Sequence, residues 1–427
     1  TYADVGGVKE DKTVAMFYWT WHVDLAYNTP INTTEFMLKY PEAKNDYDHA
    51  AWTGTGHYCF WNEPIYGFYT TEDPWVLRRH AELLANAGVD VIFTDNTNAE
   101  MTWRNAYTPL MEEWTDAMND GLKAPKVSFM LPFWDQSYTN MQVSSIYQDI
   151  YRTNKYPNLW FYYEGKPMLM ACDDHSAQQT DNLRKETYRF FTWRRPFIGG
   201  DKTSSEYRRT GQWGWLSAYP QVTFPGTRDN VKNKKIEQTT VGISQNRNYV
   251  TGEGTAMNGE NVTGRSYSTA YPDRYFKEGT EASKWGYFFA EQFDYALEID
   301  PQLIFVTGWT EWRAGRHENW GGVENAFPDQ FIDEFSRDIE PTKGDLQDHY
   351  YYQLVNYVRK FKGARPIPTP SQNATIDLNG SIDQWNTVEP YYAAYIGNTA
   401  HRDAAGYGDL RYTETSGRND IIGARVA

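Results

Sequence analysis

Glu311 is the residue whose surroundings most favour chemistry. It follows the apolar run Ile304–Gly308 and stands between Trp309 and Trp312. A carboxylate placed where a buried strand reaches the surface, and flanked by aromatic faces, is typical of sites that cleave sugars. We therefore predict that Glu311 is a catalytic residue and that the two tryptophans are platforms for sugar rings. The alternative for either tryptophan is ordinary burial in the core.

Polar side chains follow four other apolar runs in the same way, in the segments 19–24, 95–98, 133–135 and 173–175. Because the carboxyl ends of parallel strands gather at one face of a barrel, we expect these side chains to lie near Glu311. Glycoside hydrolysis needs two carboxyl groups, one that protonates the leaving oxygen and one that attacks or activates water. Asp95 and Asp135 are the predicted catalytic partners, and the alternative for each is a helix N-cap.

Other polar and aromatic residues near these run ends are predicted to contact the substrate. Glu63 lies among aromatic residues in Phe60–Pro64, where its pKa could be raised enough for it to act as an acid. Its alternative is an ordinary salt bridge in a loop. The predicted substrate-binding residues are Trp19, His22, Glu63, Asn98, Trp134, Asp173, Trp213, Trp309, Trp312 and Arg316.

Short apolar runs alternate with longer amphipathic ones over the first 365 residues, a pattern that predicts βα units around a parallel sheet. Asp73–Gly88 predicts a helix, with Asp before Pro at its start and Gly at its end. The expected fold is α/β, a (β/α)8 TIM-like barrel with long loops over residues 1–364. The strand candidates are Val14–Trp21, Val89–Thr94, Lys126–Pro132, Pro167–Cys172 and Leu303–Gly308, with weaker ones at Tyr188–Trp193, Gly214–Ala218 and Thr239–Ser244.

The composition changes at Arg365–Pro370, where three prolines fall in six residues. Such a segment suits an extended spacer, so we place a linker at 365–373. Residues 374–427 read as short strands and turns and are expected to form a partial β-sandwich-like segment. If so, the chain is a fragment of a longer protein.

Charge and composition exclude several classes of partner. There are 41 Lys and Arg against 56 Asp and Glu, which gives a net charge of −15, so we expect no nucleic-acid partner. No apolar run is long enough to insert into a membrane.

Cys59 and Cys172 form no metal-binding spacing, and no second His stands at ligand spacing, so no metal or other cofactor is predicted. Trp, Tyr and Phe make up 17% of the chain, an excess that favours a carbohydrate substrate. The start Thr1–Asp4 suggests a processed or trimmed N-terminus.

The segments Phe305–Trp312, Val89–Asn98, Phe60–Tyr69, Tyr163–Met170 and Phe335–Pro341 carry a family resemblance. Together they resemble the glycoside hydrolase family 71/99-like group of (β/α)8 proteins, over residues 14–363. The resemblance implies hydrolysis of a polysaccharide or oligosaccharide by a secreted or periplasmic, bacterial protein. In family 99 two glutamates three residues apart form the catalytic pair. Here the first aligns with Glu311, but the second falls on Ala314, so the acid must come from another strand. The segment Ile376–Trp385 resembles the opening of a DOMON-like or carbohydrate-binding β-sandwich.

Two other functions stay open from the sequence. The alanine at position 314 favours a glycan-binding protein of the same fold that does not cleave its ligand. A polysaccharide lyase would instead need a Tyr or His base and a cation such as Arg316 or Arg265 to neutralise a uronate. Oligomeric state, linkage and stereochemistry are not predicted.

Overall fold

Eight parallel strands form a nearly closed barrel in the computed structural model, which describes residues 2–22, 30–52, 58–172, 181–198, 205–270, 281–395, 400–418 and 420–427. The strands follow one another around the barrel in chain order, and each neighbouring pair from β9 through β12 and β1 to β8 is hydrogen-bonded in parallel. They are β1 (Thr13–Tyr18), β3 (Val91–Asp95), β4 (Lys126–Met130), β6 (Lys166–Met170), β7 (Thr192–Ile198), β8 (Gln212–Leu216), β9 (Gln238–Gly242) and β12 (Leu303–Trp309). The predicted barrel is confirmed.

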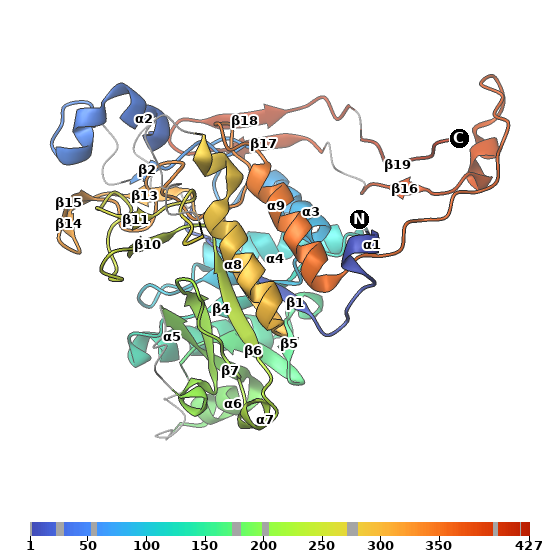
Figure 1. The fold of residues 1–427 in the computed structure, drawn as a ribbon. Helices are drawn as coiled ribbons and strands as arrows, with labels where there is room; N and C mark the ends of the chain where they lie inside the picture. Colours follow the sequence, from blue (N-terminus) through green and yellow to red (C-terminus); the bar gives the residue numbers. More distant parts are fainter. Residues whose placement is uncertain are drawn as a thin grey trace.

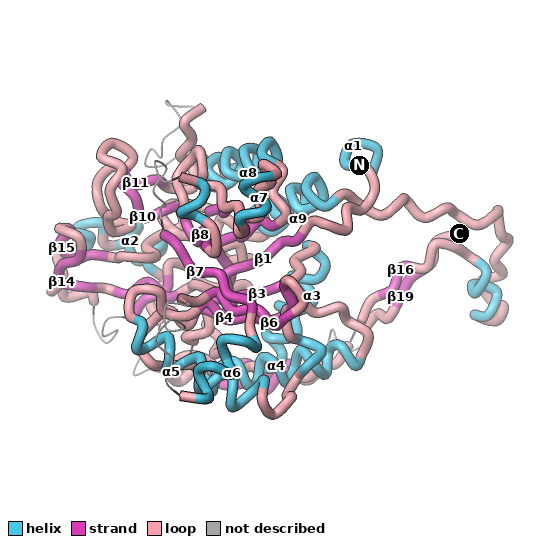
Figure 2. The backbone as a smooth tube through the Cα atoms, turned by 90° about the horizontal axis from the view of Figure 1, so that it is seen from below, coloured by secondary structure: helices cyan, strands magenta, loops and turns pink. Residues whose placement is uncertain are grey.

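Helices surround these strands, with α4, α5 and α6 on one side and α8 and α9 on the opposite side (Figures 1 and 2). The predicted helix after Asp73 is confirmed: Asp73 accepts hydrogen bonds from the amides of Trp75 and Val76, and Gly88 ends the helix in the left-handed conformation. The helices are α1 (Tyr2–Val5), α2 (Thr33–Lys39), α3 (Pro74–Ala87), α4 (Arg104–Asn119), α5 (Gln136–Ile146), α6 (Asn182–Phe190), α7 (Arg228–Lys232), α8 (Tyr287–Ile299) and α9 (His349–Lys362).

The strand predicted at Tyr188–Trp193 begins too early. Asp181 caps α6 through the amide of Arg184, and this helix continues to Phe190. The strand β7 then starts at Thr192 and alternates buried with partly exposed residues. The aromatic residue Phe190 thus belongs to the end of the helix, because the backbone becomes extended only at Phe191.

The seam between β8 and β9 is bridged by a side chain. The carboxamide of Gln238 accepts from the amide of Gly214 at 2.8 Å and donates to its carbonyl at 2.9 Å. Glycine at position 214 permits the close approach of β9, because a Cβ there would lie 2.8 Å from Cγ2 of Thr240 on that strand. One glutamine thus replaces a strand ladder at the eighth junction of the barrel.

Alternation along each strand separates two cores. On β1, Ala15 and Phe17 point into the barrel, whereas Met16 and Tyr18 point to the surrounding helices, as the period of two in a strand requires. The barrel interior contains Ala15, Phe17, Trp19, Val91, Phe93, Met130, Met168, Met170, Trp213, Leu303 and Phe305.

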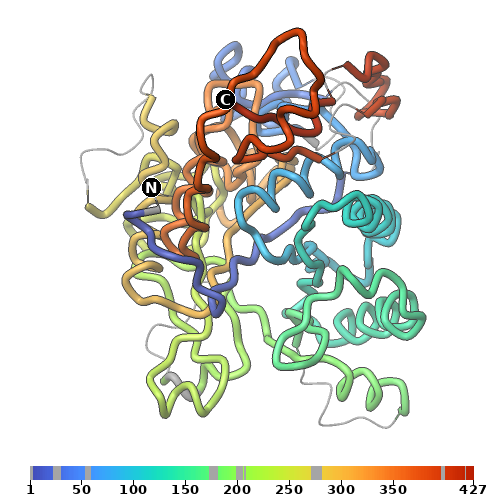
Figure 3. The backbone as a smooth tube through the Cα atoms, turned by 90° about the vertical axis from the view of Figure 1, so that its right-hand side faces the viewer, coloured from blue at the N-terminus to red at the C-terminus, as the bar shows by residue number. Residues whose placement is uncertain are grey.

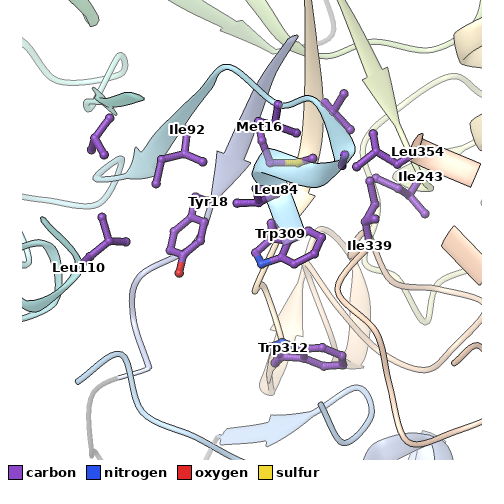
Figure 4. Packing of buried hydrophobic residues seen from close by; sticks show 14 of the residues in the cluster. Met16, Tyr18, Leu84, Ile92, Leu110, Ile243, Trp309, Trp312, Ile339 and Leu354 are labelled. Atoms are coloured by element: carbon purple, nitrogen blue, oxygen red, sulfur yellow. The ribbon is translucent and has the colours of Figure 1, made fainter. Parts of the chain in front are cut away.

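The alternation of β12 is interrupted near its end. Met16 pairs with Val306, but Tyr18, two residues later, pairs with Trp309, three residues later. One extra residue in one strand moves the following side chains to the other face. Trp309 therefore packs on the helix side with Tyr18, Met16 and Leu84 (Figure 4).

Short antiparallel ladders decorate the barrel. They pair β2 (Tyr58–Phe60) with β13 (Arg313–Gly315), β5 (Tyr162–Tyr163) with β6, β10 (Gln245–Asn248) with β11 (Val262–Thr263), β14 (His317–Trp320) with β15 (Val323–Ala326), β16 (Tyr392–Ala393) with β19 (Gly423–Ala424), and β17 (Arg402–Ala405) with β18 (Arg411–Glu414).

The hairpin β17–β18 packs on the barrel. Tyr407 donates its amide to the carbonyl of Phe68, and Phe68 donates its own amide to the hydroxyl of Tyr412. In Figure 3 the red C-terminal segments lie next to the blue N-terminal third of the chain. The ladder β16–β19 instead lies on an extension away from the barrel (Figures 1 and 2). The division into a barrel, a linker and a sandwich-like segment stays a prediction.

Arg402 anchors this hairpin to the start of α3 through Asp73. Its Nε and Nη2 atoms bond Oδ2 of Asp73 at 2.8 and 2.6 Å, and both residues are buried. Arg402→Ala leaves the Asp73 carboxylate buried without its cation, so we expect a loss of about 3 kcal/mol in the free energy of unfolding. Urea denaturation measures this change. Arg411→Ala is the control, because its ion pair with Asp403 on the same hairpin is exposed and should contribute less than about 1 kcal/mol. Equal small losses in both variants would contradict the anchoring role.

Candidate active site

A cavity of about 230 Å³ opens at the carboxyl ends of the strands. Active sites of this fold lie at that face. The described residues that line the cavity are Phe17, Trp19, Trp21, Asp95, Thr97, Asn98, Phe133, Trp134, Ile198, Trp215, Glu311, Asp329 and Arg337.

Glu311 stands in this cavity just beyond the end of β12. Its amide donates to the carboxylate of Asp338, and its Oε1 atom accepts from Nη2 of Arg337 at 2.9 Å. The side chain is buried, and burial is the main reason that the pKa of Glu311 rises to about 8. The nearby charges of Asp329 and Asp95 raise the pKa further, while Arg337 opposes the rise. Glu311 therefore holds a proton near neutral pH.

Asp95 is the last residue of β3 and lines the same cavity. Its carboxylate accepts the amide of Thr97 at 3.0 Å. Burial raises the pKa of Asp95 to about 6, although the hydrogen bonds from Thr97 oppose the rise.

The register of the sheet brings Asp95 and Glu311 to the same height. Tyr18 of β1 pairs with Thr94 on one side and with Trp309 on the other. Because β1 lies between β3 and β12, the backbones of the outer two strands are roughly 10 Å apart there. Side chains that converge from this spacing can flank a glycosidic bond.

Arg337 is the one cation among the described residues of the cavity wall, and the sequence reading missed its role. Its backbone runs beside β12: the amide of Gly308 donates to the carbonyl of Arg337, and the amide of Ile339 donates to that of Gly308. The guanidinium also bonds Asp329 at 3.2 Å. Arg337 falls within Phe335–Pro341, one of the segments that carry the family resemblance, but no apolar run precedes it.

Aromatic rings form one wall of the cavity. The rings of Trp19 and Trp21 lie 5.4 Å apart, and Trp21 stacks on Trp103 at 5.1 Å. The indole of Trp21 donates to the carbonyl of Asp95, and that of Trp134 donates to the carbonyl of Thr97. Trp134 is 58% exposed, so its ring is open to a ligand. The aromatic wall and Asp95 are therefore held by the same loop.

Four buried polar atoms of cavity residues have no partner among the groups that the structure describes. They are Oε2 of Glu311, Nε and Nη1 of Arg337, and Nε1 of Trp215. An unpaired buried polar atom is costly. A ligand with hydroxyl groups suits a wall with such atoms, because a hydroxyl both donates and accepts.

The structure brings together five of the residues predicted from the sequence. Glu311, Asp95, Trp19, Asn98 and Trp134 all line the cavity. Asp173 lies outside the described residues.

Three predicted tryptophans lie in the core instead of the cavity wall. Trp309 and Trp312 belong to the buried cluster drawn in Figure 4. Trp309 lies beside His80 of α3 and Tyr351 of α9, whereas Trp312 stacks on Trp61 at 4.6 Å and donates to Glu340. Trp213 lies in the barrel interior and donates to Glu237. The platforms predicted at Trp309 and Trp312 and the substrate contact predicted at Trp213 are corrected to core positions, since each ring is fully buried.

Asp135 and Glu63 take the alternative roles. Asp135 is the N-cap of α5, and hydrogen bonds from Ser137 lower the pKa of this exposed carboxylate. Glu63 forms a salt bridge with Lys343 at 2.5 Å. Neither side chain lines the cavity, so neither is brought together with Glu311.

His22 and Arg316 support loops from buried positions. The ring of His22 donates from Nε2 to the carbonyl of Thr310, and burial lowers its pKa to about 3, so the ring is neutral. It therefore helps to hold the turn before Glu311.

Arg316 donates to the carbonyl of Tyr47 and stacks on Trp52. Arg265 is buried against Ser336. The cations proposed for a lyase thus lie outside the cavity wall.

Position 314, where family 99 has its second glutamate, is also buried. Ala314 lies in β13, opposite Cys59 of β2, and is inaccessible to solvent.

The part of the chain that the structure describes contains no group of three His, Cys, Asp or Glu side chains arranged to hold a metal ion. None of its helices is both long and apolar enough to cross a membrane.

Comparisons with known proteins find similarity at the level of solved structures. No protein-family model and no curated protein matches the sequence. A family 99 endo-α-mannosidase from Bacteroides thetaiotaomicron, in complex with bis-tris-propane, has a TM-score of 0.47 and 16% identity over 83% of this chain and 98% of that chain. A second structure of a family 99 endo-α-mannosidase from that organism has a TM-score of 0.47 and 15% identity over 84% and 99%. A glycoside hydrolase-like protein has a TM-score of 0.43 and 11% identity over 84% and 96%.

Proposed function

We propose that this chain is a glycoside hydrolase in which Glu311 is the general acid and Asp95 is the base or nucleophile, which reverses the expectation from the family 99 alignment that the acid comes from another strand. The observation that carries the proposal is the pairing of two buried carboxyl groups of different pKa in one cavity with an aromatic wall. Environments that separate two carboxyl pKa values assign one group to the acid and one to the base. Between about pH 6 and 8, Glu311 is protonated and Asp95 is ionised.

The cavity wall suits a sugar ring. Trp19, Trp21 and Trp134 offer aromatic surface. The unpaired indole N–H of Trp215 is a donor for a sugar oxygen. The segments that resemble family 71/99 support the same activity. We propose a polysaccharide or oligosaccharide as the substrate and a secreted or periplasmic location.

Hydrolysis follows from these positions. The proton of Glu311 passes to the oxygen of the departing sugar while the C–O bond breaks. Asp95 either removes a proton from the water that attacks the anomeric carbon, or attacks this carbon itself. In the second case a glycosyl ester forms, and a water that gives its proton to the ionised Glu311 then hydrolyses the ester and releases Asp95. The products are two shorter glycans, one with a new reducing end.

A polysaccharide panel tests the proposal. Purified protein is incubated with neutral, uronate-containing and sulfated glycans, and new reducing ends are counted while products are identified by mass. A hydrolase adds one water for each bond cleaved, whereas a lyase leaves an unsaturated product that absorbs in the ultraviolet. If no glycan on a broad panel yields reducing ends, the proposed activity is wrong.

The pH dependence of kcat/KM is expected to be bell-shaped. Activity should fall below about pH 6, where Asp95 gains a proton, and above about pH 8, where Glu311 loses one. The two limbs are measured with the glycan found on the panel, at substrate concentrations well below KM. A profile that stays flat from pH 5 to 9 would contradict the assignment.

A glycan-binding protein without hydrolysis is the second candidate. It is favoured by Ala314, which leaves the position of the second family 99 glutamate without a carboxylate. Binding on a glycan array, together with the absence of new reducing ends from the bound glycan, would establish it.

A further inference from the structure

We propose that Arg337 is a positioning residue that directs the acidic proton of Glu311 into the cavity. The inference rests on the proposed function, because it assigns to Glu311 the part of an acid. It adds which oxygen of Glu311 carries the proton, and it names Arg337 as the residue that determines this.

The contact between Arg337 and Glu311 is specific to one oxygen. Nη2 of Arg337 lies 2.9 Å from Oε1 of Glu311, while Oε2 is buried without a partner among the described groups. A guanidinium has donors and no acceptor. The carbonyl oxygen of a carboxylic acid accepts hydrogen bonds better than its hydroxyl oxygen does, so the contact with Arg337 favours the proton on Oε2 when Glu311 is protonated. Oε2 is the oxygen without a partner among the described groups, on a residue that lines the cavity.

The segment around Arg337 holds Glu311 at two points. Asp338 accepts the amide of Glu311, so adjacent residues contact both the backbone and the side chain of the acid. Arg337 is itself fixed, because its amide donates to the side chain of Gln330 at 2.8 Å and its carbonyl accepts the amide of Gly308. The guanidinium is 1% exposed. These contacts leave it little freedom to turn away.

The charges around Glu311 give Arg337 a second effect. The described charged groups that face Glu311 are Asp95 on β3 and Asp329, Arg337 and Asp338 on the segment after β12. Arg337 is the cation among them, and it also bonds Asp329. Without Arg337, only carboxyl groups would surround Glu311 among these charges, and the pKa of Glu311 would rise further.

A double-mutant cycle tests the coupling without any substrate. The free energy of unfolding is measured from pH 5 to 10 for the wild type, Glu311→Gln, Arg337→Gln and the double variant. The difference in the free energy of unfolding between the wild type and Glu311→Gln should change with pH up to about 8, where Glu311 ionises in the folded protein. When both proteins also carry Arg337→Gln, this difference should continue to change to a pH about one unit higher or more, because the pKa of Glu311 is then higher. An unchanged pH range would overturn the proposal.

Two further variants keep the cycle decisive. Arg402→Gln removes another buried arginine from an ion pair and should leave the pH range of the Glu311 effect in place. If Arg337→Gln does not fold, Arg337→Met replaces it, because methionine removes the charge and keeps an unbranched side chain. The pH range of the Glu311 effect should also move upward in this variant, and an unchanged range would again overturn the proposal.

Activity on a glycan from the panel supplies the second measurement. Arg337→Gln should lower kcat by about 100-fold and move the alkaline limb of the pH profile upward, while KM changes by less than about threefold. A purely structural arginine would not move that limb. If the wild type cleaves no glycan, the proposed function fails while the unfolding cycle still reports on Arg337. If the wild type is active and the limb stays in place, the assignment of Arg337 alone fails.

Discussion

Glu311→Gln is expected to lower kcat/KM for glycan cleavage by about 1,000-fold, the effect of losing a general acid. Glutamine keeps the size of the side chain and can still accept from Arg337, so the cavity should retain its shape. It cannot give up a proton to a departing sugar. Initial rates of reducing-end release on the cleaved glycan measure the loss, and binding of that glycan should change much less.

Glu334→Gln is the matched control for this substitution. Glu334 is also a buried glutamate, and burial raises its pKa to about 7, but its Oε1 accepts from Ser266 outside the cavity. This variant should keep rates within about threefold of the wild type, since only the cavity groups touch the substrate. Activity of Glu311→Gln within a few-fold of the wild type would remove Glu311 from the mechanism.

Glu311→Gln is also expected to stabilise the protein at alkaline pH, by about 5 kcal/mol when the effect is complete. The pKa of Glu311 rises from 4.5 to about 8 because the side chain is buried. The folded chain therefore binds this proton more tightly than the unfolded chain does. Stability of the wild type falls as pH rises from the unfolded to the folded pKa. Glutamine does not ionise, so the variant escapes this loss.

The measurement is urea denaturation of both proteins at pH 5 and pH 9. The two should differ little at pH 5, where Glu311 is mostly protonated when folded, and diverge at pH 9. Asp135→Asn is the control, because its effect on stability has the opposite dependence on pH. The pKa of Asp135 is lowered in the folded protein, so this carboxylate stabilises the fold at high pH and loses that effect as pH falls. It should give no gain at pH 9. A Glu311→Gln protein that is less stable than the wild type at pH 9 would contradict the raised pKa.

Local patterns in the sequence were sufficient for the barrel. The apolar runs at Val89–Thr94 and Leu303–Gly308 predicted strands that the structure contains, since a strand buried on both faces must be apolar throughout. The residues that end such runs were also predictable as candidates. Asp95 and Glu311 reach the same cavity because parallel strands in a barrel end at one face.

The tertiary structure decided which side chains near a strand end face the cavity. Trp309 points to the helices because β12 shifts register by one residue, and this shift leaves no trace in the apolar pattern. Asp135 caps a helix, a role that an aspartate after a strand can take as readily as a catalytic one.

The charge that surrounds Glu311 was likewise decided in three dimensions. Arg337 and Asp329 lie on a segment without a periodic pattern, and they reach Glu311 because that segment runs along the end of β12. The sequence by itself determined the barrel and offered Glu311 as its most informative residue, because both depend on short-range patterns of apolar and polar residues. Only the tertiary structure decided its partners and its protonation, because these depend on burial and on contacts between segments that are not adjacent in the chain.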